Sequence, residues 1–173
     1  MHAPAKALAL SQPLLRGLIV LNLLYAVGIG LLFTASLFAA DVVFDALGVT
    51  QGPHRATLLL GMRAMMVAGV LGAVVVDRVL RHLLAMVDSV RAGDPFVAGN
   101  ATRLQAIAWW VLAGEVLRLA VAAIAWAASS PEQALDVNVG FSLAPWLAVL
   151  LLFVLARVFA EGTRLRDDLE GTV

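Results

Sequence analysis

The sequence predicts an all-α membrane protein, a four-transmembrane-helix bundle with a cytoplasmic amphipathic extension of the second helix. Three observations lead to this fold class. Hydrophobic residues make up 62% of the chain and charged residues only 14%, whereas soluble domains carry roughly 25% charged residues. The apolar residues form runs long enough to cross a bilayer, and the basic residues gather in alternate connections between these runs. We therefore expect a single integral membrane domain over residues 1–173.

The first and fourth predicted spans contain no Asp, Glu, Lys or Arg. They cover residues 17–40 and residues 137–156. A helix needs about 20 apolar residues to cross a hydrocarbon core of about 30 Å, and both runs are long enough. A cleaved signal peptide is the alternative for the first run. It is disfavoured because the apolar region of such a peptide is typically about 7–15 residues long.

The second and third predicted spans carry charges. Residues 57–76 are apolar except for Arg63, and residues 104–128 contain both Glu115 and Arg118. The alternative for the third segment is a helix that lies in the membrane interface. The distribution of basic residues places both termini on the same side of the membrane. The number of crossings must then be even, which favours a third crossing.

Basic residues set the predicted orientation, since cytoplasmic connections are enriched in Lys and Arg. The connection between spans one and two and that between spans three and four hold only Arg55, together with four acidic residues. The other side holds the two termini and the connection between spans two and three. Its basic residues are Lys6, Arg16, Arg78, Arg81, Arg91, Arg103, Arg157, Arg164 and Arg166. We expect a multi-pass membrane protein with both termini in the cytoplasm.

The polar connections suggest further structure. Beyond residue 76, apolar residues recur at helical spacing opposite a polar face, which predicts an amphipathic helix over 79–90. The apolar face consists of Val79, Leu80, Leu83, Leu84, Val87 and Val90. Asn100 is a suitable residue to cap the third helix. Residues 41–56 are expected to form an outer loop, with a turn at Gly52-Pro53.

The sequence offers little catalytic chemistry. It has no cysteine, no Gly-x-Ser-x-Gly elbow and no nucleotide-binding fingerprint in a βαβ context. His2, His54 and His82 are dispersed, so we expect no metal site, no cofactor and no catalytic residues. The zero formal net charge argues against direct nucleic-acid binding. An intramembrane enzyme that uses Glu115 as an acid or base is a remaining alternative.

Arg63, Glu115 and Arg118 form the candidate intramembrane site, because an ionisable residue inside a span suggests function by default. A rise of 1.5 Å per residue places Arg63 and Arg118 at a similar depth, about 9 Å from the outer edge. We predict one cluster with Glu115 between the two guanidinium groups and Asn22 among the further acceptors. Removing Glu115 should then destabilise the protein more than removing either arginine. A structural ion-pair cluster is the leading interpretation, and a functional site is the alternative.

Small residues recur at Ala64, Ala68 and Gly72, a spacing that allows close helix approach. Packing within the chain is the favoured interpretation. A face for homo-oligomer formation is the alternative.

Two predicted cytoplasmic segments resemble a known family. They are Gly93-Asp94-Pro95-Phe96, followed by Asn100-Ala101-Thr102-Arg103-Leu104, and the C-terminal segment from Phe159 to Val173. Together with four helices, they resemble the domain of unknown function 2975 family of small bacterial membrane proteins. The resemblance implies a protein of the bacterial inner membrane, but it implies no activity, ligand or catalytic residue. It does imply a context, because similar proteins are often encoded beside a small helix-turn-helix regulator.

Two functions of different classes follow. The first is a non-enzymatic membrane partner or sensor that acts on such a cytoplasmic regulator. Its surface would comprise Arg78, Arg81, Arg91, Arg164, Arg166, Asp167 and Asp168. The alternative for these charges is contact with only lipid headgroups and water. The second function is a small transporter, channel or immunity-type membrane protein that uses the intramembrane charges. The absence of an inverted repeat disfavours transport.

Overall fold

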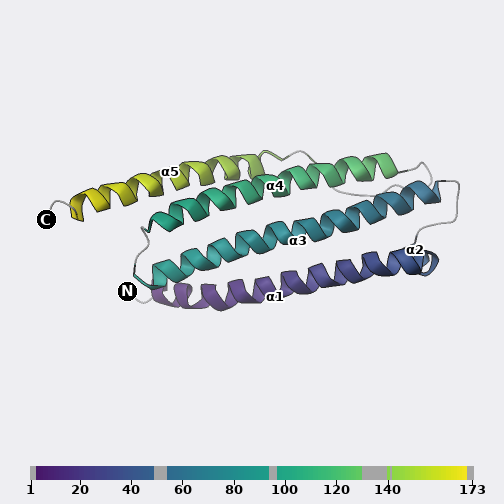
Figure 1. Ribbon diagram of the computed structural model, residues 1–173, viewed down its shortest axis with the longest axis horizontal. Coiled ribbons are helices and arrows are strands. Elements are labelled where there is room, and N and C mark those ends of the chain that lie inside the picture. Colours follow the sequence, from purple (N-terminus) through teal and green to yellow (C-terminus); the bar gives the residue numbers. More distant parts are fainter. Residues whose placement is uncertain (1–2, 49–53, 94–96, 130–139, 141, 171–173) are drawn as a thin grey trace. The chain divides into compact units, whose positions relative to one another are not determined.

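A computed structural model describes residues 3–48, 54–93, 97–129, 140 and 142–170. Within these ranges the chain is helical and contains no strand. The five helices are labelled in Figure 1 and are α1 (Ala3–Phe38), α2 (Ala40–Ala46), α3 (Arg55–Arg91), α4 (Ala98–Ala128) and α5 (Ala144–Glu170). The predicted turn at Gly52-Pro53 lies outside the described residues.

Four of these helices are long and apolar enough to cross a membrane. Their candidate spans are Leu10–Phe38, Arg55–Arg91, Gly99–Ala128 and Ala144–Arg166, with mean hydropathy between 1.8 and 2.2. Large apolar side chains on each of them are exposed, including Leu31, Leu60, Trp126 and Leu147. Contiguous apolar surface of this kind is costly in water and is satisfied by lipid. The prediction of an all-helical protein with four such helices is confirmed.

The helix boundaries differ from the predicted spans at several ends. α1 begins far upstream of residue 17 and ends at Phe38, because Ala39 adopts a non-helical conformation with φ −134° and ψ 52°. α5 begins at Ala144 rather than at residue 137. The Ser142 hydroxyl accepts a bond from the Ala144 amide at 3.3 Å, and Pro145 in the first turn needs no amide partner. Residues 137–139 lie outside the described part of the chain.

The segment expected to be an outer loop contains a helix, α2. Its Phe44 is fully buried and packs with Leu58 and Met66 of α3, and this cluster also contacts Ile29 and Phe33 of α1. Burying an aromatic side chain contributes about 1.5–3 kcal/mol. The burial of Phe44 in this cluster therefore stabilises α2 against α1 and α3.

The chain divides into two compact units, defined by residues 1–21, 75–113 and 142–173 (unit 1) and by residues 22–74 and 114–141 (unit 2). In unit 1, Trp109 of α4 and Phe153 of α5 make an edge-to-face contact with ring centroids 5.3 Å apart. In unit 2, Gly61 of α3 lies against Ala128 of α4 so closely that an added Cβ would be 2.3 Å from the Ala128 Cβ. Small residues thus bring helices together within unit 2.

Candidate functional site

Two of the three predicted intramembrane charges pair within unit 2. The Arg118 guanidinium donates from Nη2 to Glu115 Oε1 at 2.7 Å and from Nε to Glu115 Oε2 at 3.0 Å. Both residues lie on α4, three positions apart, so they share a face of the helix. The Glu115 side chain is only 5% exposed and that of Arg118 is 33% exposed. This bidentate geometry is the strong form of a charge-assisted pair.

Arg63 is not part of this pair, which corrects the prediction of one cluster with Glu115 between two guanidinium groups. Arg63 Nη2 donates to the backbone carbonyl of Ser36, and Nε lies 3.4 Å from the Ser36 hydroxyl. Its guanidinium carbon also lies 5.7 Å from the centre of the Phe44 ring. The interruption of the helix at Ala39 leaves the Ser36 carbonyl without the usual bond from the amide of residue 40. α2 places the Phe44 ring within reach of the same guanidinium. Neither feature was expected from the sequence.

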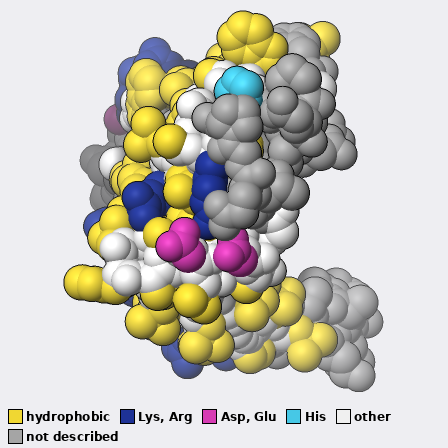
Figure 2. Space-filling view, turned by 90° about the vertical axis from the view of Figure 1, so that its right-hand side faces the viewer, with side chains coloured by type: hydrophobic (Ala, Val, Ile, Leu, Met, Phe, Trp, Pro, Cys, Tyr) yellow, Lys and Arg dark blue, Asp and Glu magenta, His cyan; other side chains and the backbone are white. Residues whose placement is uncertain are grey.

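Arg55 joins α2 to the start of α3 in unit 2. Its guanidinium donates to Asp41 at 2.9 Å and to Asp45 at 3.0 Å. Figure 2 shows acidic and basic side chains beside one another on the face that carries α2 and the start of α3. Asn22 of α1 donates to the Ala73 carbonyl of α3 at 2.9 Å, so it serves interhelical packing rather than the charge pair.

In unit 1 two sets of polar contacts join α3 to α1 and to α4. Gln12 of α1 donates to Asp88 of α3 at 2.9 Å and accepts a bond from Arg91. Asn100 of α4 is almost fully buried and donates to the Ser89 hydroxyl at 2.7 Å. Asn100 therefore does not cap α4, which begins two residues earlier at Ala98. It connects α4 to α3 instead.

Arg103 belongs to the second set, since it donates to the Asn100 side chain at 2.8 Å. Isolated polar residues such as Gln12, Ser89 and Asn100 gave no sequence signal for these contacts. The contacts form only because the ends of three helices meet.

The predicted partner surface also lies in unit 1. Its residues differ in whether they form hydrogen bonds or ion pairs within the chain. Arg81 is held by Asp77 at 2.7 Å, and Arg91 is held by Gln12. Arg164 lies 4.0 Å from both Glu161 and Asp168. Arg78 is exposed and has no ion pair or hydrogen bond among the described residues. Arg166 and Asp168 are exposed, whereas the side chain of Asp167 lies outside the description.

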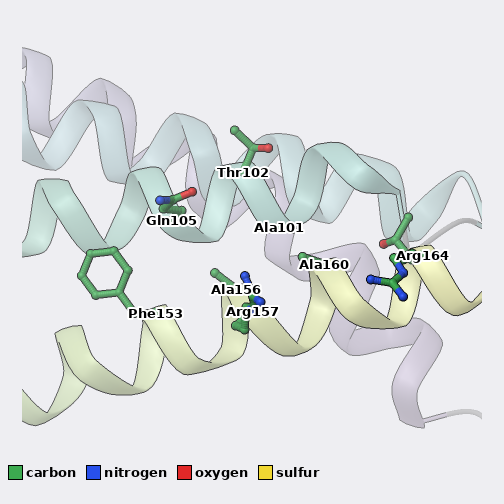
Figure 3. Close-up of a pocket in the computed structure, with 9 residues that line it drawn as sticks. Ala101, Thr102, Gln105, Phe153, Ala156, Arg157, Ala160 and Arg164 are labelled. Carbon is green, nitrogen blue, oxygen red and sulfur yellow. The ribbon is translucent and has the colours of Figure 1, made fainter.

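A pocket of about 480 Å³ lies between α4 and α5 of unit 1. Thr102 and Gln105 of α4 line one side, and Phe153, Arg157 and Arg164 of α5 line the other (Figure 3). Sequence reasoning did not find this pocket. Its lining is spread over two helices, and only the register between them brings these residues together.

The described residues contain no group of three His, Asp or Glu side chains placed to hold a metal ion. Unit 2 holds the ion pairs of Arg118 and Arg55. Unit 1 holds hydrogen bonds between helices, ion pairs of Arg81 and Arg164, and a pocket lined by two arginines.

Comparison with known proteins gave one match. A family model described as "Protein of unknown function (DUF2975)" matches residues 51–173. The match includes both segments that carry the resemblance seen in the sequence, and it confirms that resemblance. No curated protein and no solved structure matched the chain.

Proposed function

The chain belongs to the DUF2975 family, and from this premise we propose that it is a membrane partner or sensor that acts on a small cytoplasmic helix-turn-helix regulator. In this proposal it is a non-enzymatic protein of a bacterial inner membrane. The helix ends that we assign to the cytoplasm belong to unit 1, and they present the surface that binds the regulator.

The distribution of charge is the observation that carries this proposal. Unit 1 contains nine of the twelve basic residues and seven of the twelve acidic residues, while unit 2 contains three basic and five acidic residues. A basic excess on one side of a multi-pass protein is typical of the cytoplasmic side. A soluble regulator would therefore meet unit 1.

The length of α3 supports the same proposal. The helix continues without a break to Arg91, well past the predicted end of the span at residue 76. In our proposal, residues 77–91 project from the bilayer as the amphipathic extension. The bonds from Gln12 and Asn100 to Asp88 and Ser89 would hold this extension in place. A partner surface on a held helix loses less conformational freedom on binding than one on a free helix.

Bonds within the chain reduce the number of arginines that are available to contact the regulator. Arg81 and Arg91 already have partners within the chain, so they orient the surface more than they contact the regulator. Arg78 makes no ion pair or hydrogen bond among the described residues, and both Arg78 and Arg166 are exposed, so we expect these two residues to touch the regulator.

Co-purification tests the proposal. The full chain is extracted in mild detergent with the regulator encoded beside it, and the regulator's transcription target is measured after deletion of the membrane protein. We expect a complex that the double variant Arg78→Gln/Arg166→Gln weakens at least about tenfold, since each charged contact is worth about 1.5–3 kcal/mol. Arg16→Gln is the matched control because Arg16 is also exposed in unit 1 but lies on α1. No complex, together with unchanged transcription, overturns the proposal.

The transport hypothesis draws less support from the site. Glu115 is engaged by Arg118 with both oxygens, and Arg63 is engaged by a backbone carbonyl. Charges held this way favour a structural role over an ion pathway. Solute or ion flux in reconstituted vesicles would favour transport instead.

A further inference from the structure

We propose that the pocket between α4 and α5 binds an anionic phospholipid, with the Arg157 and Arg164 guanidinium groups on its phosphate. This site does not depend on the proposed regulator. Basic pockets between membrane helices on the cytoplasmic side are a recurring mode of anionic lipid recognition. The pocket has the chemistry and the position that such a ligand requires.

Arg157 supplies a cation that the chain itself does not neutralise. Its side chain is exposed, and it makes no ion pair or hydrogen bond within the described ranges. Arg164, two helical turns along α5, reaches its acidic neighbours only at 4.0 Å. Guanidinium groups bind phosphate through paired N–H donors, so both side chains are suited to a phosphodiester.

The opposite side of the pocket adds neutral polar groups. Thr102 and Gln105 of α4 line it, and neither makes a hydrogen bond to another described residue. A hydroxyl and an amide are able to donate to phosphate or glycerol oxygens. The pocket thus offers donors from both helices to one ligand.

The apolar end of the pocket favours a lipid over a free anion. Figure 3 shows Phe153 at one end, Arg164 at the other and Arg157 between them. The predicted membrane boundary falls at residues 104 and 156, so Phe153 lies at the hydrocarbon side and Arg157 and Arg164 lie at the headgroup side. A phosphate with an attached acyl chain matches this gradient, whereas inorganic phosphate would use only one end.

Lipid titration of the delipidated full chain in detergent tests the proposal. Phosphatidylglycerol and phosphatidylcholine with identical acyl chains are added, and binding is followed by native mass spectrometry and by the melting temperature. We expect phosphatidylglycerol to bind at least about tenfold tighter than phosphatidylcholine. Arg157→Gln should weaken phosphatidylglycerol binding about tenfold, since it removes a charged hydrogen-bond donor.

Two further variants make the result specific. Arg16→Gln changes the charge equally outside the pocket and should bind phosphatidylglycerol as the unaltered protein does. Ala160→Phe fills the pocket without changing the charge and should weaken binding at least as much as Arg157→Gln does. The proposal is overturned if Arg157→Gln and Arg16→Gln behave alike, or if both lipids bind equally. It is also overturned if inorganic phosphate or glycerol 3-phosphate stabilises the protein as much as the lipid does.

Discussion

The two units differ in whether all of their arginines have a polar partner in the chain. In unit 2 every arginine has a polar partner in the chain, because Arg55 binds two aspartates, Arg63 binds Ser36 and Arg118 binds Glu115. In unit 1, Arg78 and Arg157 are exposed and have no polar partner among the described residues. Arg63 and Arg118 lie within the predicted spans, whereas Arg78 and Arg157 lie just beyond span ends that we assign to the cytoplasm. A cation within hydrocarbon must be satisfied by the protein, whereas one at the cytoplasmic surface is satisfied by water, lipid phosphate or a partner.

Breaking the buried pair of unit 2 should have the largest effect. Arg118→Gln leaves the Glu115 carboxylate, which is 5% exposed, without its partner. We expect the melting temperature in detergent to fall by roughly 10 °C. Glu115→Gln should cost less, because Arg118 is one-third exposed and also lies 3.5 Å from the Gly140 carbonyl.

This order reverses the one predicted from the sequence, where Glu115 was expected to serve two arginines. The double variant Glu115→Gln/Arg118→Gln should recover much of the lost stability. An equal or larger effect of Glu115→Gln would mean that the pair is not arranged as described.

Disturbing the close packing within unit 2 should have the next largest effect on stability. Gly61→Ala places a Cβ 2.3 Å from the Ala128 Cβ, and overpacking of this kind costs about 1–3 kcal/mol. Gly72→Ala is the matched control, because its Cβ would lie 3.7 Å from Leu117, an ordinary contact. Alanine has the higher helix propensity by about 1 kcal/mol, so the control should be neutral or stabilising. Reversible unfolding in mixed detergent measures both, and equal stability of the two variants would contradict the close contact.

The smallest effects should separate an arginine that has ion pairs from one that has none. The Arg55 side chain is only 12% exposed, but its partners Asp41 and Asp45 are 87% and 53% exposed. Arg55→Gln removes both contacts and should cost about 1 kcal/mol, and high salt should diminish this cost. Arg78→Gln should change the free energy of unfolding by less than about 0.5 kcal/mol at any salt concentration. If Arg78→Gln destabilises as much as Arg55→Gln, the contrast between the units does not extend to their surfaces.

The sequence by itself determined the helical class, the four apolar helices and the family. Each depends on local information, such as the length of a run or the spacing of charges. The pair between Glu115 and Arg118 was foreseen for the same reason, since residues three positions apart on a helix share a face whatever the tertiary structure.

Only the tertiary structure decided the partners between helices. Arg63 bonds to Ser36 and contacts Phe44 because α1 ends at Phe38 and the segment expected to be a loop forms α2. Asn100 reaches Ser89 because α4 starts earlier than its expected cap. The α4–α5 pocket likewise depends on which faces of two apolar helices meet. Helices that are apolar on most sides carry a weak signal for their register, so these contacts follow from packing between residues distant in the sequence.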